Sequence, residues 1–90
     1  MYNAETALSL VKARMNRLQE DTTLDEYLRE RIKGAAENLE GIGIKLREEN
    51  AEDLMLLVDL TVWQYQNRDS ASGMPEWLRL RRRERWLRGK

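Results

Sequence analysis

The chain has 90 residues, which is enough for one domain and too few for a second independent core. It contains neither cysteine nor histidine, so disulfides, thiolate metal sites and the most common general base are excluded. Its net charge is zero, but residues 75–90 hold seven basic and two acidic side chains (net +5), and residues 1–74 hold nine basic and fourteen acidic ones (net −5). Such a chain can match opposite charges within itself or head-to-tail with further copies of itself.

Neither a membrane span nor a signal peptide is expected. The longest aliphatic run, Leu54–Val58, is far shorter than the roughly 18 residues that a membrane-spanning helix needs. The first residues lack the basic and apolar stretches of a secretory signal. We therefore expect a soluble, intracellular protein.

The composition is that of a helical protein, since Ala, Leu, Glu and Arg dominate and phenylalanine is absent. A first apolar stripe recurs at spacings of three and four residues: Leu8, Val11, Met15 and Leu18. This stripe predicts a helix over about residues 4–18. Thr23 and Glu26 have the spacing of a capping box, which predicts the start of a second helix that carries an apolar stripe as far as Leu39.

The next segment is predicted to be a short link between the second and third helices. Gly41 or Gly43 can take the left-handed conformation that ends a helix. Three apolar residues then alternate with small or polar ones, which predicts an extended segment with one buried face: Ile42, Ile44 and Leu46. Asn50 is a good N-cap for the third helix.

The third predicted helix, about residues 51–68, is apolar nearly all round. Only Glu52, Asp59 and Gln66 hold a narrow polar stripe, so nearly all of the helix has to be buried. Three short companion helices can hardly wrap it, and we infer that part of it faces another subunit; the alternative is the central helix of a monomeric bundle. Asp59 either lies on the exposed stripe or pairs with an arginine of a neighbour.

Small and polar residues over 67–77 predict a turn, and Pro75 predicts the start of a fourth, basic helix over residues 75–90. Three apolar residues lie on one side of it, where they are expected to dock: Trp77, Leu80 and Leu87. Leu78 and Trp86 lie elsewhere. Six arginines occupy most of the rest: Arg79, Arg81, Arg82, Arg83, Arg85 and Arg88. Residues 1–90 are thus predicted to form a single all-α domain, a small bundle of about four helices with a short extended link between helices 2 and 3.

Groups that could carry out catalysis are nearly absent. The glycines at 41 and 43 lack the third glycine and the preceding strand of a phosphate-binding loop. The acidic cluster around residues 48–53 lacks the alternating ligands and the central glycine of a calcium loop. We expect no enzymatic activity, no cofactor and no metal.

The arginine run alone does not name its partner, because guanidinium groups match phosphate and carboxylate equally well. Binding to DNA would be strongly salt-dependent, and no helix-turn-helix with a polar recognition face is evident. A membrane-surface helix usually has a cleaner apolar face. An ordinary solvated face is a further alternative, but the acidic remainder of the chain supplies a built-in partner and favours contact between subunits.

The segment Met55–Arg88, MLLVDLTVWQYQNRDSASGMPEWLRLRRRERWLR, resembles the C-terminal half of small tailed-phage and prophage head–tail connector proteins. In these proteins an aliphatic helix runs into an aspartate, a Trp/Tyr pair, a small-residue turn, a Met-Pro and a basic helix. The segments ALSLVKARM and YLRERIKGAAENLEGIGI resemble the first two helices of that family. The run Arg81–Arg83 is denser than is usual there.

This resemblance implies a non-catalytic, mostly helical adaptor that assembles as a ring beneath the portal, extends the DNA channel and docks the tail. Its partners would be further copies of itself, the portal protein and the next head-completion or tail protein, with DNA in the channel as a secondary, non-specific contact. Its location would be the head–tail junction of the virion and, before assembly, the cytoplasm of the bacterial host. The runner-up is a small regulatory protein that binds nucleic acid through the basic helix.

The sequence pattern and the resemblance together predict two sets of contact residues, and the resemblance makes Trp63 and Tyr65 candidate anchors between helices. Subunit or partner contacts are expected at Asp59, Trp63, Tyr65, Trp77, Leu80 and Leu87. A basic contact surface is expected at Arg79, Arg81, Arg82, Arg83, Arg85 and Arg88.

Overall fold

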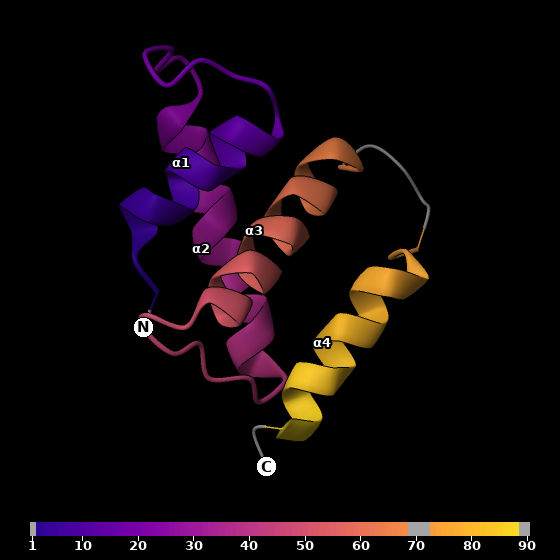
Figure 1. Ribbon diagram of the computed structural model, residues 1–90. Coiled ribbons are helices and arrows are strands. Elements are labelled where there is room, and N and C mark those ends of the chain that lie inside the picture. The colour runs from indigo at the N-terminus through magenta and orange to yellow at the C-terminus, as the bar shows by residue number, and fades with distance from the viewer. Residues whose placement is uncertain (1, 69–72, 89–90) are drawn as a thin grey trace.

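The computed structural model describes residues 2–68 and 73–88, which form four helices (Figure 1). They are α1 (Ala4–Arg14), α2 (Asp25–Gly41), α3 (Ala51–Gln66) and α4 (Glu76–Arg88). Neither of the two described ranges contains a strand, so the predicted all-α fold is confirmed. The first three helices all pack against one another, whereas α4 packs only on α3 among the described helices.

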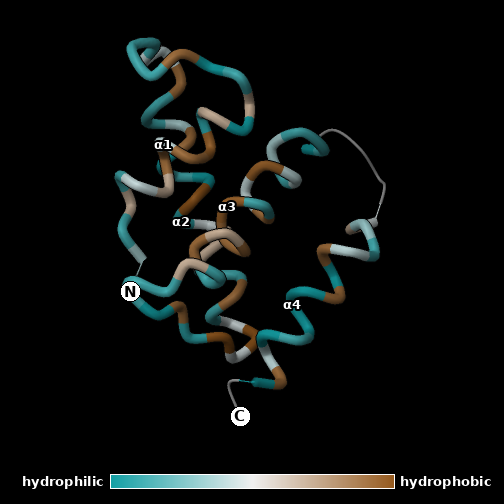
Figure 2. Tube along the Cα trace, viewed as in Figure 1, coloured by the Kyte–Doolittle hydropathy of each residue, from teal (hydrophilic) through white to brown (hydrophobic). Residues whose placement is uncertain are grey.

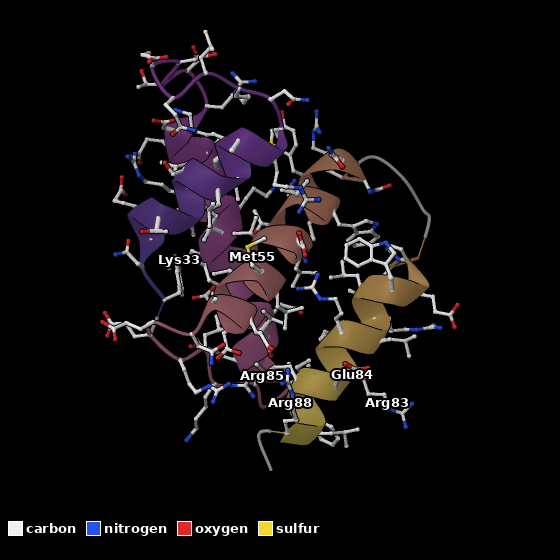
Figure 3. The ribbon with its side chains drawn as sticks, viewed as in Figure 1. Lys33, Met55, Arg83, Glu84, Arg85 and Arg88 are labelled. Carbon is white, nitrogen blue, oxygen red and sulfur yellow. The ribbon has the colours of Figure 1, made fainter. Side chains whose placement is uncertain are left out.

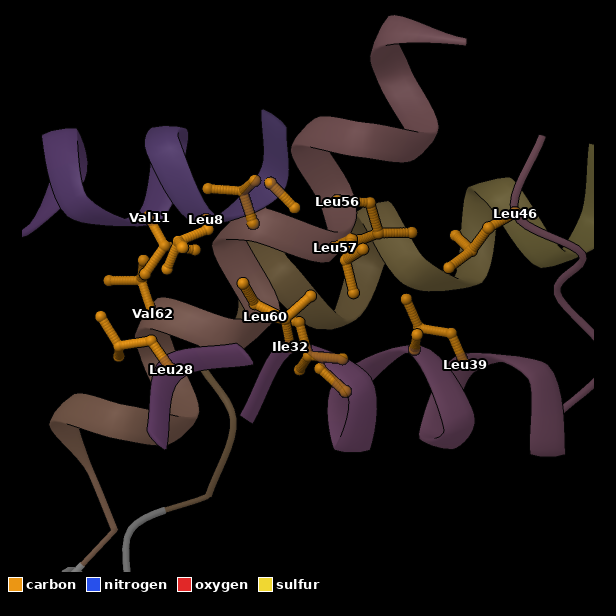
Figure 4. Close-up of a cluster of buried hydrophobic side chains, with 14 of the residues drawn as sticks. Leu8, Val11, Leu28, Ile32, Leu39, Leu46, Leu56, Leu57, Leu60 and Val62 are labelled. Atoms are coloured by element: carbon orange, nitrogen blue, oxygen red, sulfur yellow. The ribbon is translucent and has the colours of Figure 1, made fainter. Parts of the chain in front are cut away.

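The core lies where α1, α2 and α3 meet (Figure 4). Its largest fully buried apolar side chains are Val11, Leu28, Ile32, Leu39, Ile44, Leu57, Val58, Leu60 and Leu78. Every residue from 56 to 62 on α3 is buried within the single chain. This stretch is therefore covered by α1, α2 and α4 of its own chain, and contact of another part of α3 with a second subunit stays a prediction.

The chain leaves the first helix earlier than predicted. Helix α1 ends at Arg14, and Asn16 takes a left-handed conformation (φ 58°), which turns the backbone away from the helix axis. As a result Leu18 does not continue the apolar stripe and is 71% exposed.

The predicted capping box is absent. Helix α2 begins at Asp25, and its N-cap residue, Leu24, offers no side-chain hydrogen bond to the helix. Thr23 instead donates its backbone N–H to Asp21 Oδ1 at 3.0 Å, so this segment forms a local turn that Asp21 closes.

The link between α2 and α3 is confirmed in its main features. Gly43 has φ 100° and ends α2, and Ile44 and Leu46 are buried, although Ile42 is exposed. A Cβ atom on Gly43 would lie 3.1 Å from Trp86 Nε1, so the missing side chain lets α4 approach this corner closely. Asn50 caps α3 as predicted, since its side chain accepts from the Asp53 N–H at 2.9 Å.

At the C-terminal end, α4 begins at Glu76, close to the start predicted from Pro75. Four residues of the predicted turn, 69–72, and the last two of the predicted helix, 89–90, lie outside the described residues. Along α4, hydrophobic positions alternate with hydrophilic ones (Figure 2).

Replacing a core leucine tests this packing. Leu57→Ala should lower the free energy of unfolding by about 2–5 kcal/mol, because Leu57 is fully buried in the middle of α3. The matched control, Leu18→Ala, should change it by less than about 0.5 kcal/mol, because that side chain faces water. Urea unfolding followed by circular dichroism measures both. Equal losses would contradict the placement of the core.

Candidate functional site

The fourth helix docks on α3 through a different face from the one expected. Leu78 is fully buried and Arg85 is 5% exposed, and these two residues, seven apart, mark the inward side of the helix. Trp86 packs against the core beside them. The three apolar residues that were expected to dock are instead exposed, by 50%, 47% and 54% respectively: Trp77, Leu80 and Leu87.

Arg85 points inward because α3 offers it a buried carboxylate. Arg85 Nε donates to Asp53 Oδ1 at 2.6 Å, and its NH2 group donates to Asp53 Oδ2 at 3.2 Å and to the Lys45 carbonyl at 2.6 Å. Arg47 adds its backbone N–H at 2.9 Å and its Nε at 3.2 Å to the same carboxylate. Asp53 is 1% exposed, so this cluster is a sealed ion pair that ties α4 to the start of α3. Arg85 therefore drops out of the predicted basic contact surface.

The arginines determine the acidity of Asp53. Burial disfavours its charged form, but the hydrogen bonds from Arg85 and Arg47 outweigh burial and lower the pKa of the carboxyl from 3.8 to about 2. The same contact with Asp53 raises the pKa of Arg85. Both groups therefore stay charged at neutral pH.

Asp59 holds a second ion-pair cluster. It is 5% exposed and accepts from Arg14 of α1 and from Arg81 of α4. Asp59 thus joins three helices of one chain. Neither sequence alternative holds, since Asp59 is not on an exposed stripe and its arginine partners belong to its own chain.

A third ion pair also joins α4 to α3. Arg88 NH2 lies 2.8 Å from Glu52 Oε2, and both side chains are largely exposed. Arg81, Arg85 and Arg88 therefore all pair with carboxylates of α3. Asp53, which holds Arg85, is not among the predicted site residues, although an aspartate in the first turn of so apolar a helix is a signal of such a contact.

The remaining three arginines of the helix form a different surface. Arg79, Arg82 and Arg83 make no ion pair with any described residue. In Figure 3, Arg83 points away from the body of the molecule and Arg85 points toward it. The three arginines line a groove of about 610 Å³ between α4 and the end of α2. We call this the arginine groove and define it by Ile42, Arg79, Leu80, Arg82, Arg83 and Trp86.

The two aromatic residues predicted as anchors lie near the end of α3. Trp63 and Tyr65 are half-buried and pack against the core. The Tyr65 ring meets that of Tyr27 edge-on, with centroids 5.9 Å apart, and the Arg68 guanidinium lies 4.3 Å from its centroid. Both residues thus act as anchors between helices of one chain, and their contact with another subunit stays a prediction.

The described residues contain no group of three or more His, Cys, Asp or Glu side chains that could hold a metal ion. Among them, no helix combines the length and the apolar character needed to cross a membrane.

Comparison of the chain with protein-family models, curated proteins and solved structures finds no match. Its function therefore has to be argued from its own residues and their geometry.

Neutralising the buried carboxylate tests how α4 is held. Asp53→Asn should lower the free energy of unfolding at pH 7 by about 3–5 kcal/mol, because it leaves Arg85 buried without its counter-charge. The control, Glu52→Gln in the same turn, should cost less than about 1 kcal/mol, since its ion pair with Arg88 is exposed.

The stabilising effect of Asp53, measured against Asp53→Asn, should depend on pH. Asp53 has a lower pKa folded (about 2) than its ordinary value of 3.8, so its contribution of roughly 2 kcal/mol is complete above about pH 4 and is lost as the pH falls through about 2. The gap in unfolding free energy between the natural chain and Asp53→Asn should therefore narrow over that window. Urea unfolding at several pH values measures it. A difference in unfolding free energy that stays constant over this pH range would show that these hydrogen bonds do not lower the pKa of Asp53.

Proposed function

We propose that this chain is a structural subunit of a tailed-phage or prophage head–tail connector. It assembles with further copies as a ring beneath the portal, extends the DNA channel and docks the tail. The observation that supports this most directly is the outward side of α4. There Leu80 is exposed beside Arg79, Arg82 and Arg83, which form no ion pair with the described residues, and Trp77 and Leu87 are exposed on the same helix. Exposed apolar patches with a polar rim mark surfaces that bind other proteins.

The distribution of charge supports contact with unlike surfaces. A ring is built from head-to-tail interfaces, in which one surface of a subunit meets a different surface of the next. The outward arginines lie on the basic fourth helix, and residues 1–74 carry a net charge of −5. Each copy therefore carries both members of a complementary pair.

The alternative function, binding nucleic acid through the basic helix, has less support. It needs the arginine run to be free, but Arg81, Arg85 and Arg88 are paired with α3 carboxylates. Three arginines remain, and the exposed Leu80 among them has no role in contacting phosphates.

Reversing two outward charges tests the proposal. Arg82→Glu with Arg83→Glu should reduce self-association in sedimentation velocity, and the number of rings in negative-stain images, far more than any affinity for free duplex DNA. The matched control, Lys33→Glu with Lys45→Glu, changes the net charge equally at two exposed positions outside the arginine groove and should assemble normally.

Two outcomes would count against the proposal. Rings that survive the double reversal unchanged would show that these arginines are not at the interface. A strict monomer that binds duplex DNA tightly at about 0.15 M salt would favour the nucleic-acid-binding alternative instead.

A further inference from the structure

The loop between α1 and α2, residues 15–24, displays a leucine to solvent. Leu18 is 71% exposed, more than any other large hydrophobic side chain in the described part of the chain. Beside it, Glu20 is exposed and forms no ion pair with the described residues, whereas Asp21 pairs with Arg17 at 3.0 Å. The loop therefore presents one apolar side chain and one free carboxylate together.

This loop is held in place by a set of hydrogen bonds. The buried Lys12 donates its Nζ to the Gln19 carbonyl at 2.8 Å. Gln19 and Ser9 exchange two further bonds, at 2.9 and 3.2 Å, and the Asp21 N–H closes a turn onto the Leu18 carbonyl at 3.1 Å. Because the fold fixes the backbone of Leu18 before any partner arrives, burying it would cost little conformational entropy.

The arginine groove is complementary to a segment that carries an apolar side chain and a carboxylate. Its lining is apolar at Ile42, Leu80 and Trp86, which calls for an apolar side chain. Its other three lining residues are the arginines without ion-pair partners, which call for a carboxylate. No acidic residue of the described ranges lines it.

Loop and groove lie at opposite ends of α2. The loop leads into Asp25, and Ile42, the C-cap of α2, lines the groove. The 17 residues of α2 separate them by about 25 Å, and Figure 1 places the loop at one end of the molecule and the end of α2 at the other. A contact between them has to join two copies, and it is a head-to-tail contact of the kind that closes a ring or extends a filament.

We propose that Leu18 of one copy inserts into the arginine groove of the next copy, where Glu20 faces the arginines. This inference rests on the proposed function and names the surfaces that meet. Another acidic surface of the chain is the outer stripe of α2, where Lys33 lies among Glu26, Glu30, Glu37 and Glu40. That stripe is charged at every position and offers no apolar side chain for the apolar lining of the groove.

Disulfide trapping tests the contact, because the chain has no cysteine of its own. Glu20→Cys and Arg83→Cys are mixed under mild oxidation, with one variant tagged so that mixed dimers separate by mass. Leu18, Ile42, Leu80 and Trp86 stay intact. The mixed disulfide should form about tenfold faster than the control pair Lys33→Cys with Arg83→Cys, which reports the outer stripe of α2.

A reciprocal charge swap supplies a second measurement. Glu20→Arg and Arg83→Glu should each weaken self-association roughly fivefold, and the chain that carries both should regain most of the loss, because each interface then holds the reversed pair. Leu18→Asp should weaken self-association about tenfold or more without changing the thermal midpoint, since Leu18 makes no core contact.

The outcomes separate this inference from the proposed function. A chain that self-associates, but whose Lys33→Cys pair is trapped faster, places the outer stripe of α2 in the groove and overturns the loop assignment alone. The loop assignment alone is also overturned if the chain self-associates, neither cysteine pair is trapped above background, and the double charge swap restores nothing. A chain that neither associates nor cross-links overturns both.

Discussion

Two buried carboxylates on α3 determine how the fourth helix lies. Asp53 and Asp59 are almost fully enclosed, and an enclosed carboxylate without a counter-charge costs several kcal/mol. Arg81 and Arg85, four residues apart on one side of α4, supply that counter-charge, together with Arg14 and Arg47. Burying Leu80 and Leu87 would contribute about 1.5–3 kcal/mol each, whereas leaving a buried charge without its partner costs about 3–5 kcal/mol at each of the two carboxylates. The helix therefore turns its arginines inward and leaves Leu80 and Leu87 in water.

The same balance explains which parts of the structure could be predicted from the sequence. The all-α class, the Asn50 cap and the buried side of the link at Ile44 and Leu46 follow from local patterns, and the structure confirms them. The rotation of α4 does not follow from its own pattern, because its strongest apolar side is the one that faces out. It depends on the charges of α3 and becomes visible only when the two helices are brought together.

The position of Leu18 likewise could not be predicted from the local sequence pattern. The spacing of Leu8, Val11, Met15 and Leu18 fits a helix, and the pattern holds for the residues that α1 contains. The helix ends at Arg14 because Asn16 turns left-handed and because Lys12, buried beneath the loop, binds the Gln19 carbonyl. Such a long-range bond from a buried lysine has no sequence signature, so the predicted apolar stripe includes Leu18, which lies at the surface.

Three of the six arginines of α4 thus hold the helix on α3, and the other three lie on its outer side without an ion-pair partner among the described residues. Once Arg81, Arg85 and Arg88 are paired on α3, the helix has one side that is satisfied within the chain and one that is not. The arginine groove includes Ile42 at the end of α2 as well as residues of α4, although the two helices do not pack directly. An occupant of that groove would touch both and hold α4 against the three-helix body, so binding there would stabilise the native arrangement of the helix. In the proposed assembly, this binding would add to the stability that the ion pairs with α3 already give the fourth helix.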